Sequence, residues 1–180
     1  MACQAGPEAV YDLLADLRTH LEWGGTRQRR DFRLITLDAP PGPATVGATF
    51  SSTGTIPMSV RHWEDHSTVT AADRARVFEF ITEATNGGAQ RMRARYRHRY
   101  ELAPEGPGSR VTYTVTQLEV ARPMLRMALP GVRDLTWGMA IPMLCRRGLR
   151  NLLELAERSA VRATRQPSPA PVRSIHAKEN

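Results

Sequence analysis

The sequence predicts an α+β fold in which a curved antiparallel β-sheet wraps around a long C-terminal helix. Three observations support this prediction: an apolar helical stripe near the start, a run of segments with alternating polarity, and a longer helical stripe near the end. A run of strands followed by a helix is typical of α+β proteins. A sheet with one apolar face must cover that face, and the C-terminal helix is the large apolar partner in this chain.

The first helix is predicted from residue 7 to about residue 23. Pro7 suits the first helical position, and Glu8 lies at the positive end of the helix dipole. Apolar residues then recur at helical spacing, namely Val10, Leu13, Leu14, Leu17 and Leu21. The polar residues off this stripe are expected to face solvent: Asp12, Asp16, Arg18 and His20. The Asp16–His20 pair, one turn apart, is therefore interpreted as a surface pair rather than a catalytic one.

Six segments between the two helices alternate in polarity and are predicted strands: residues 28–37, 45–54, 58–71, 77–83, 91–102 and 110–118. Turn-forming residues separate them, including the Pro-rich residues 39–43 and the Asn-Gly-Gly of residues 86–88. In residues 58–71, alternation places His62 on the inner face. The polar run over residues 64–67 is expected to interrupt this strand with a bulge or a break.

Residues 91–102 show the clearest alternation in the chain. Arginine occupies positions 91, 93, 95, 97 and 99, whereas semi-polar and aromatic residues lie between them. Alternate side chains of a strand share a face, so one face is predicted to be basic and wet and the other covered. Together with the following strand, the covered face includes Tyr96, His98, Tyr100, Tyr113 and Gln117. Either their polar tips find partners in a packed core, or they line a cavity.

The long helix is predicted from about residue 134 to near residue 163. Its inward stripe consists of Cys145, Leu149, Leu152, Leu153, Ala156 and Ala160. Pro142 either kinks this helix or marks its true first turn. A short helix is also expected at residues 124–129. Residues 1–163 are predicted to form one domain, and the basic, Pro-rich residues 164–180 a disordered tail.

The net charge of +7 does not by itself indicate nucleic-acid binding. From Arg158 onward the chain carries five basic residues against Glu179, which accounts for four of the seven net charges. Most of the remaining excess lies on the arginine face, and no helix-turn-helix or zinc-finger motif accompanies it, so nucleic acid is not the expected partner. A solvated arginine face is favoured over one that docks an acidic partner, and peripheral membrane contact is kept as an alternative.

The sequence gives no indication of a metal, a cofactor or an export signal. Cys3 and Cys145 lack metal-ligand spacing, and this cysteine usage favours a reducing cytoplasm as the location. The N-terminus lacks the basic and apolar regions of a signal peptide. Phosphate-binding loops, dinucleotide fingerprints and nucleophile elbows are absent from the sequence. No cofactor is therefore expected.

Residues 7–16, Pro-Glu-Ala-Val-Tyr-Asp-Leu-Leu-Ala-Asp, resemble the opening helix of the START-like superfamily, also called SRPBCC. The Leu-Glu-Trp of residues 21–23 is similar to the segment that follows there, and residues 78–80, 96–102 and 108–113 resemble its later strands. The resemblance covers roughly residues 6–160. It implies a helix-grip fold with an internal cavity for an apolar or amphipathic small molecule. The most similar branch is the polyketide cyclase/dehydrase and lipid-transport group.

One feature departs from that family, which begins with a strand before the first helix. Only residues 1–5 precede Gly6, enough for a stub at best. The strand at residues 110–118 would then have an unpaired edge, which proteins normally cover. We expect either an upstream start that encodes the strand or a second chain, as in a homodimer, that covers the edge.

The leading hypothesis is a binding protein with a cavity for a hydrophobic or amphipathic small molecule, lipid or polyketide-like. Ligand pockets combine apolar walls with a few convergent polar groups, and flexible Met side chains adapt to varied apolar shapes. The residues expected to line the cavity are His62, Phe78, Phe80, Tyr96, His98, Tyr100, Tyr113, Gln117, Met139 and Met143.

The alternative hypothesis is an enzyme, a polyketide aromatase/cyclase or dehydratase. Such chemistry needs a general base for an activated α-proton and a donor for the enolate oxygen. The candidate bases are His98 and His62, and the candidate donors are Tyr96, Tyr100 and Tyr113. The sequence contains no catalytic signature that decides between binding and catalysis.

Overall fold

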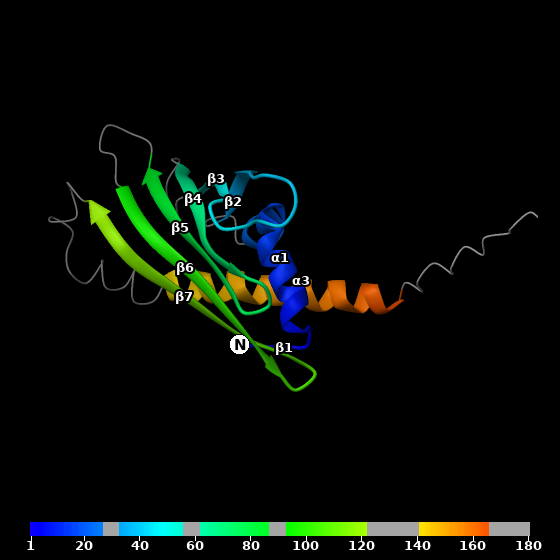
Figure 1. Cartoon of the computed structure of the whole chain (residues 1–180). Coiled ribbons are helices and arrows are strands. Elements are labelled where there is room, and N and C mark those ends of the chain that lie inside the picture. The colour runs from blue at the N-terminus through cyan, green and yellow to red at the C-terminus, as the bar shows by residue number, and fades with distance from the viewer. Residues whose placement is uncertain (27–32, 56–61, 87–92, 122–140, 166–180) are drawn as a thin grey trace, which may run out of the picture.

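The computed structural model describes residues 1–26, 33–55, 62–86, 93–121 and 141–165. Within these ranges, seven antiparallel strands form one open sheet in the order β1-β7-β6-β5-β4-β3-β2 (Figure 1). The strands are β1 (Ala2–Cys3), β2 (Leu34–Asp38), β3 (Thr49–Thr55), β4 (His62–Asp73), β5 (Val77–Asn86), β6 (Arg93–Glu105) and β7 (Gly108–Ala121). The helical elements are α1 (Pro7–Ala15), η1 (Leu17–Thr19), η2 (Glu22–Thr26) and α3 (Ile141–Arg165). The predicted α+β class is confirmed.

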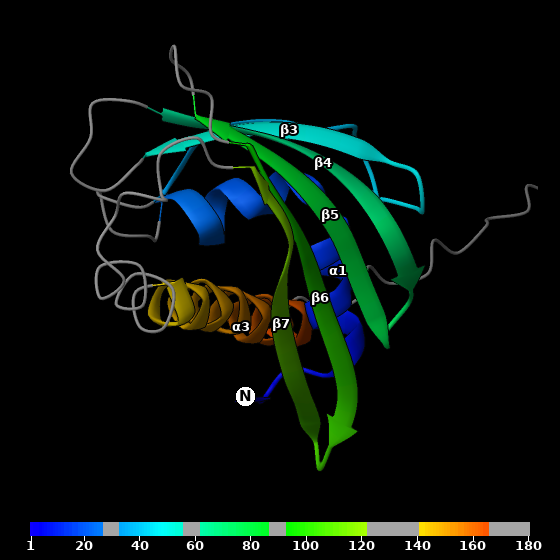
Figure 2. The same ribbon diagram turned by 90° about the vertical axis from the view of Figure 1, so that its left-hand side faces the viewer.

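The sheet curves around the helices. Figure 2 shows β3 to β7 arching over α1 and α3, which lie on the same, concave side of the sheet. Helix α3 packs against α1, η2 and β1, and α1 also contacts β5, β6 and β7. An antiparallel sheet that curves around a C-terminal helix is consistent with a helix-grip arrangement.

The core lies between the concave face and the inward stripe of α3. The buried members of the predicted stripe are Leu149, Leu152, Leu153 and Ala156, and Cys145 and Ala160 are half-buried. The four buried residues join one cluster with residues of α1 and the sheet, including Leu14 and Phe78. A fully buried side chain of this size stabilises the fold by about 1.5–3 kcal/mol.

Helix α3 as the structure describes it runs from Ile141 to Arg165, and the predicted helical residues 134–140 lie outside the described residues. Within this range the helix places Pro142 in its first turn, where a missing N–H costs nothing. It ends at Arg165, slightly beyond the predicted end. The predicted short helix at residues 124–129 and the tail from residue 166 lie outside the described residues.

The first helix is shorter than predicted. Helix α1 ends at Ala15, and the chain continues through the short helical turns η1 and η2. The side chain of Asp16 accepts a hydrogen bond from the backbone N–H of Arg18 (3.3 Å) and so begins a new turn. This break changes the helical phase. His20, which was predicted to face solvent, is therefore buried.

Strand β4 continues through the predicted interruption. Residues 64–67 pair with β3 and β5 without a shift, and the irregularity lies farther along, between Val69 and Ala71. Ladder hydrogen bonds on both edges hold this central strand. Because Ser67 and Val69 are the buried positions and the side-chain period is two, His62 lies on the opposite, exposed face. The predicted inward orientation of His62 is wrong.

The β6–β7 hairpin has the predicted faces. Three cross-strand pairs place the covered side chains together: Tyr100 with Tyr113, His98 with Val115, and Tyr96 with Gln117. Gly106, in the connecting turn, has a φ of 57°, a left-handed conformation that glycine adopts without strain.

Strand β1 is a two-residue stub at one end of β7. Ala2 pairs with Arg110 and Cys3 with Ser109. The backbone N–H of Val111 also donates to the carbonyl of Met1 (2.8 Å). A Cβ atom at Gly108 would collide with the carbonyl oxygen of Cys3, so the close approach of β1 requires glycine there.

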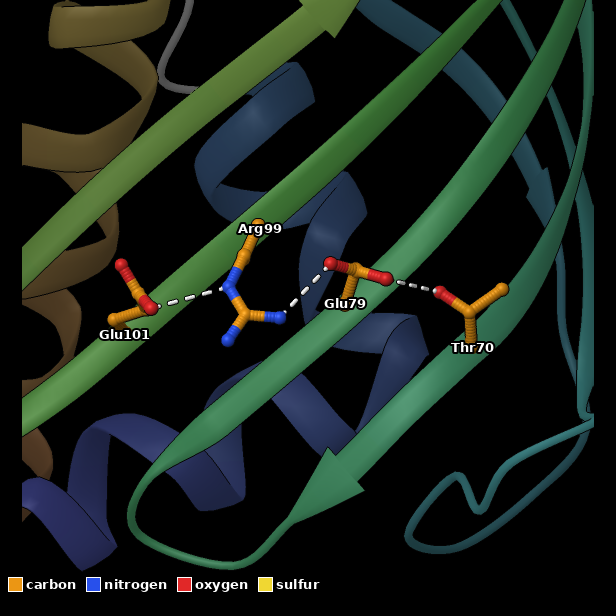
Figure 3. A network of polar contacts seen from close by, with 4 residues as sticks. All are labelled: Thr70, Glu79, Arg99 and Glu101. Carbon is orange, nitrogen blue, oxygen red and sulfur yellow. Dashed lines mark hydrogen bonds and ion pairs between the residues drawn. The ribbon is translucent and has the colours of Figure 1, made fainter.

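The described arginines of β6 lie on the convex face. Figure 3 shows Arg99 between Glu79 and Glu101, at 3.0 and 3.1 Å, with the helices behind the sheet. Thr70 also donates a hydrogen bond to Glu79 (2.8 Å). Burial alone would raise the pKa of Glu79, but the hydrogen bonds from Thr70 and Arg99 outweigh it and hold the pKa below its ordinary value. The sheet therefore supplies acids that neutralise part of its own basic face.

Candidate functional site

Aromatic side chains form a layer on the concave face, which we name the aromatic wall: Phe50, Phe80, His98, Tyr100 and Tyr113. The rings of Phe80 and His98 stack with centroids 4.8 Å apart and planes at 15°, and those of Tyr100 and Tyr113 with 4.3 Å and 15°. Phe50 of β3 meets Phe80 edge to face at 5.4 Å. Each such pair adds about 0.5–1.5 kcal/mol beyond its buried area. The wall is thus a rigid apolar surface that spans β3 and β5 to β7.

His98 lies at the centre of the aromatic wall and is uncharged. Its Nδ1 atom lies 2.7 Å from the hydroxyl oxygen of Tyr113. Burial, with a smaller contribution from His20, lowers the pKa of His98 to about 4. At neutral pH the ring is therefore a neutral imidazole whose Nδ1 is already engaged.

The hydroxyl of Tyr113 connects the aromatic wall with α3. It interacts with the hydroxyl of Tyr100 and with the thiol of Cys145. Burial raises the pKa of Tyr113 and that of Cys145 above their ordinary values. A thiol nucleophile requires the thiolate form, so this neutral Cys145 is placed for packing rather than for attack.

His20 packs on the aromatic wall from the N-terminal side. Its Nε2 lies 3.0 Å from the carbonyl oxygen of Leu14, to which the neutral ring donates its proton. The ring lies 4.7 Å from that of Trp23 and 5.8 Å from that of Phe50. Burial lowers the pKa of His20 to about 4. Helical periodicity placed this residue in solvent, and the capping residue Asp16 is the sequence signal that could have corrected it.

Asp65 is the candidate residue that the sequence-based prediction missed. It belongs to the inner set of β4, between Ser52 of β3 and Ala84 of β5. Its Oδ1 atom is buried and has no hydrogen-bond partner in the part of the chain that the structure describes. Burial raises the pKa of Asp65 to about 8. Its signal in the sequence is the alternation of β4, which runs unbroken through Trp63, Asp65, Ser67 and Val69.

Other polar groups lie on the same part of the concave face. Ser52 and Ser67 are buried, and the Ser67 hydroxyl lies 2.9 Å from that of Thr82. The indole Nε1 of Trp23, in η2, is a second buried atom without a partner among the described residues. Asn151 of α3 donates to the Trp23 carbonyl (3.0 Å) and so holds η2 against α3. The concave face thus has the aromatic wall and, beside it, a polar part on β3 and β4.

Most of the predicted lining residues lie on the concave face. The buried ones are Phe78, Phe80 and Tyr100, and the half-buried ones are Tyr96, His98 and Tyr113. Gln117 shares the face but is exposed. His62 is excluded because it lies on the convex side. Met139 and the side chain of Met143 lie outside the described residues.

A separate open groove of about 380 Å³ lies at the β2 side of the sheet. It is lined by Asp38, Ala39, Pro40, Thr49, Phe50, Ser51, His66, Ser67 and Thr68. It shares Phe50 and Ser67 with the concave face but includes neither His98 nor Asp65. The described residues hold no cluster of His, Cys, Asp or Glu that could bind a metal ion. None of the helices that the structure describes is long and apolar enough to cross a bilayer.

Comparison with known proteins gives likeness of fold. No family model and no curated protein sequence matches this chain. An uncharacterized protein from Rhizobium leguminosarum is 14% identical with a TM-score of 0.63, over 88% of this chain and 91% of that one. A conserved protein from Geobacillus kaustophilus is 12% identical with a TM-score of 0.62, over 88% and 93%. A protein from Chromobacterium violaceum is 15% identical with a TM-score of 0.55, over 87% and 94%.

The descriptions of these three structures name no activity. At such low identity, the likeness shows the fold alone. Function has to be argued from the residues of the concave face.

Proposed function

We propose that this chain is a START-like, helix-grip protein of the SRPBCC type that binds a hydrophobic or amphipathic small molecule, lipid or polyketide-like, between the sheet and α3. The observation that carries the proposal is the two-part concave face, where the aromatic wall adjoins buried polar atoms that have no partner among the described residues. Apolar walls with a few polar groups are typical of ligand sites. The likeness of fold to solved structures supports the architecture.

The polar atoms favour a binding face over a packed core. A core pairs its polar groups, because a buried group without a partner costs about 1–3 kcal/mol. His98 and Tyr113 pair with each other, as core residues would. The Oδ1 of Asp65 and the Nε1 of Trp23 have no partner in the part of the chain that the structure describes. A bound molecule that supplies their partners would remove this cost.

Two neighbouring residues of β7 provide a matched test. Val115 is half-buried beside His98 on the concave face, and Thr114 is exposed on the convex face. Val115→Trp fills the proposed site, whereas Thr114→Trp adds the same indole outside it. We expect Val115→Trp to weaken the binding of a fluorescent fatty acid by about tenfold or more, and Thr114→Trp to leave it unchanged.

Native mass spectrometry of the protein purified without added ligand complements this titration. A co-purified small molecule on the wild type and on Thr114→Trp, but not on Val115→Trp, is the expected result. A wild type that carries no ligand and binds no fatty-acid probe contradicts the proposal.

A second candidate function, a polyketide cyclase or dehydratase, is favoured by the hydrogen bond of 2.7 Å between His98 and Tyr113. In that case His98 would take an activated α-proton and Tyr113 would donate to the enolate oxygen. A general base works best with a pKa near the working pH, and the pKa of His98 is about 4. His98 is therefore a weak base, and binding is the better supported function.

The variant His98→Gln separates the two functions. Gln keeps a hydrogen-bonding partner for Tyr113 but cannot act as a base. A cyclase would lose about 10²–10⁴-fold in turnover of a poly-β-keto thioester with little change in affinity, whereas a binding protein would change in affinity alone. The matched control is His66→Gln, because His66 is exposed on β4. Turnover is followed by mass spectrometry of the products. If the wild type shows none, the enzymatic function is excluded.

A further inference from the structure

We propose that Asp65 anchors the ligand and that the molecule bound on the concave face is a basic amphiphile: an apolar body that lies along the aromatic wall and an amine that pairs with the Asp65 carboxylate. This inference rests on the proposed binding function and narrows it to one chemical class. It assigns a role to a residue that neither the sequence pattern nor the aromatic wall explains.

The first argument is the position of Asp65. The residue lies in the middle of β4, and its cross-strand neighbours on the concave face, Ser52 and Ala84, have short side chains that supply no hydrogen-bond partner to its Oδ1. The nearest inner hydroxyl along β4, that of Ser67, lies 2.9 Å from the hydroxyl of Thr82 and is engaged there. The Oδ1 atom is left buried and without a partner among the described residues. An acid in such a place needs a partner that the described residues do not provide.

The second argument is charge. Among the described residues, the arginines lie on the convex face, in exposed turns or on the outer surface of the helices, so the concave face offers Asp65 no cation. His20 and His98 are neutral there. An ammonium group would supply the missing charge, and an ion pair with a hydrogen bond is stronger than a neutral one.

The third argument links ligand class to pH. Burial raises the pKa of Asp65 to about 8, so at about pH 6 the free protein holds a neutral carboxyl group. Pairing with an ammonium ion requires the carboxylate and therefore releases one proton. The affinity for an amine should rise by about tenfold per pH unit up to about pH 8 and then level off. A neutral alcohol should bind with no such dependence.

Other titratable groups near the concave face do not produce this dependence. His20 of the N-terminal turns and His98 of β6 have pKa values of about 4 and stay neutral in this range. The pKa values of three further groups are raised by burial: Tyr100, Tyr113 and Cys145 of α3. Tyr96 of β6 and the exposed Glu22 of η2 are also among the described titratable groups here, as are Tyr11 of α1 and Cys3 of β1, whose pKa values burial raises. Strands β3 and β5 contribute Ser52 and Thr82, which do not titrate.

The experiment compares three ligands with the same ten-carbon chain: decylamine, 1-decanol and decanoic acid. Isothermal titration calorimetry at about pH 6, 7 and 8, in two buffers of different ionisation enthalpy, measures affinity and counts the protons released. We expect decylamine to bind about tenfold or more tightly than decanol at pH 8, with release of one proton at pH 6. Asp65→Asn should abolish this preference and the proton release. Glu64→Gln, which removes the adjacent exposed acid on the convex face, should change neither.

The outcomes separate this inference from the proposed function. If decanol or decanoic acid binds and decylamine gains nothing from Asp65, the ligand class is wrong and the binding function stands. If none of the three binds, both fail. The carboxyl ¹³C resonance of Asp65 in the wild type gives a second measurement that needs no variant. Its pKa should fall well below its value in the free protein when decylamine is bound, and an unchanged pKa overturns the inference.

Discussion

His20 and His98 are buried, and burial lowers the pKa of each to about 4, although the charge of Asp16 acts the other way on His20. Asp65 shows the opposite shift for the same reason, because burial without a cation raises its pKa to about 8. All three residues are therefore neutral or nearly so around pH 7. The unfolded chain lacks these shifts, so folding is coupled to pH at each of these residues.

The signs of these shifts predict a maximum in stability near pH 6.5. The ordinary pKa of histidine is 6.5. As pH falls from 6.5 toward 4, both histidines bind protons in the unfolded state, whereas His20 and His98 stay unprotonated in the folded state, so stability is lost. Asp65 acts in the other direction, because the folded state keeps its proton between pH 3.8 and about 8 while the unfolded state releases it. Above pH 6.5 only the loss due to Asp65 remains.

Urea denaturation across this pH range measures the effect. The free energy of unfolding should fall by up to about 1.4 kcal/mol per pH unit between 6.5 and 8 in the wild type and stay level in Asp65→Asn. Toward pH 4 both proteins should lose stability through the histidines, and Asp65→Asn should lose it more steeply, because in the wild type Asp65 offsets part of that loss. Parallel curves for the two proteins above pH 6.5 would show that Asp65 is ionised in the fold.

The contact of β1 with β7 depends on one glycine. A Cβ atom at Gly108 would collide with backbone atoms of Cys3, which cannot move aside as the end of a flexible side chain could. We expect Gly108→Ala to cost about 1–3 kcal/mol and to release β1 from the sheet. The control is Gly6→Ala, because an added Cβ at Gly6 meets nothing within 4 Å.

Hydrogen exchange locates the effect of Gly108→Ala in the sheet. The amide of Val111, which donates to Met1 at 2.8 Å, should exchange faster in this variant. The amide of Leu102, which donates to Arg76 at 2.8 Å, should keep its protection. Unchanged exchange at Val111 would mean that β1 tolerates the added methyl group.

At the scale of the whole molecule, local patterns predicted the elements whose faces depend on period alone. Alternation placed Tyr96, His98 and Tyr100 on the covered face of β6, and helical spacing placed Leu149 and Leu152 on the inner side of α3. In both cases one face is buried along the whole element, so a single period describes it.

The errors come from interactions that a period cannot show. The capping bond of Asp16 ends α1 early and turns His20 inward, and pairing with two neighbours carries β4 straight through residues 64–67. The candidate site is the part that the sequence predicts least well, because the burial and the pKa of Asp65 depend on its neighbours in space. Desolvation depends on packing between segments far apart in the chain.

The two faces of β6 have a consequence for how the chain finds its fold. Shifting the pairing of β6 by one residue would exchange its faces and bring Arg95, Arg97 and Arg99 under α3, while Tyr96 and His98 moved into water. The free-energy cost of burying even one unpaired guanidinium group exceeds the net free energy of folding of a typical domain. Misregistered hairpins are therefore eliminated during folding, and the arginines contribute to the uniqueness of the native state without touching its core.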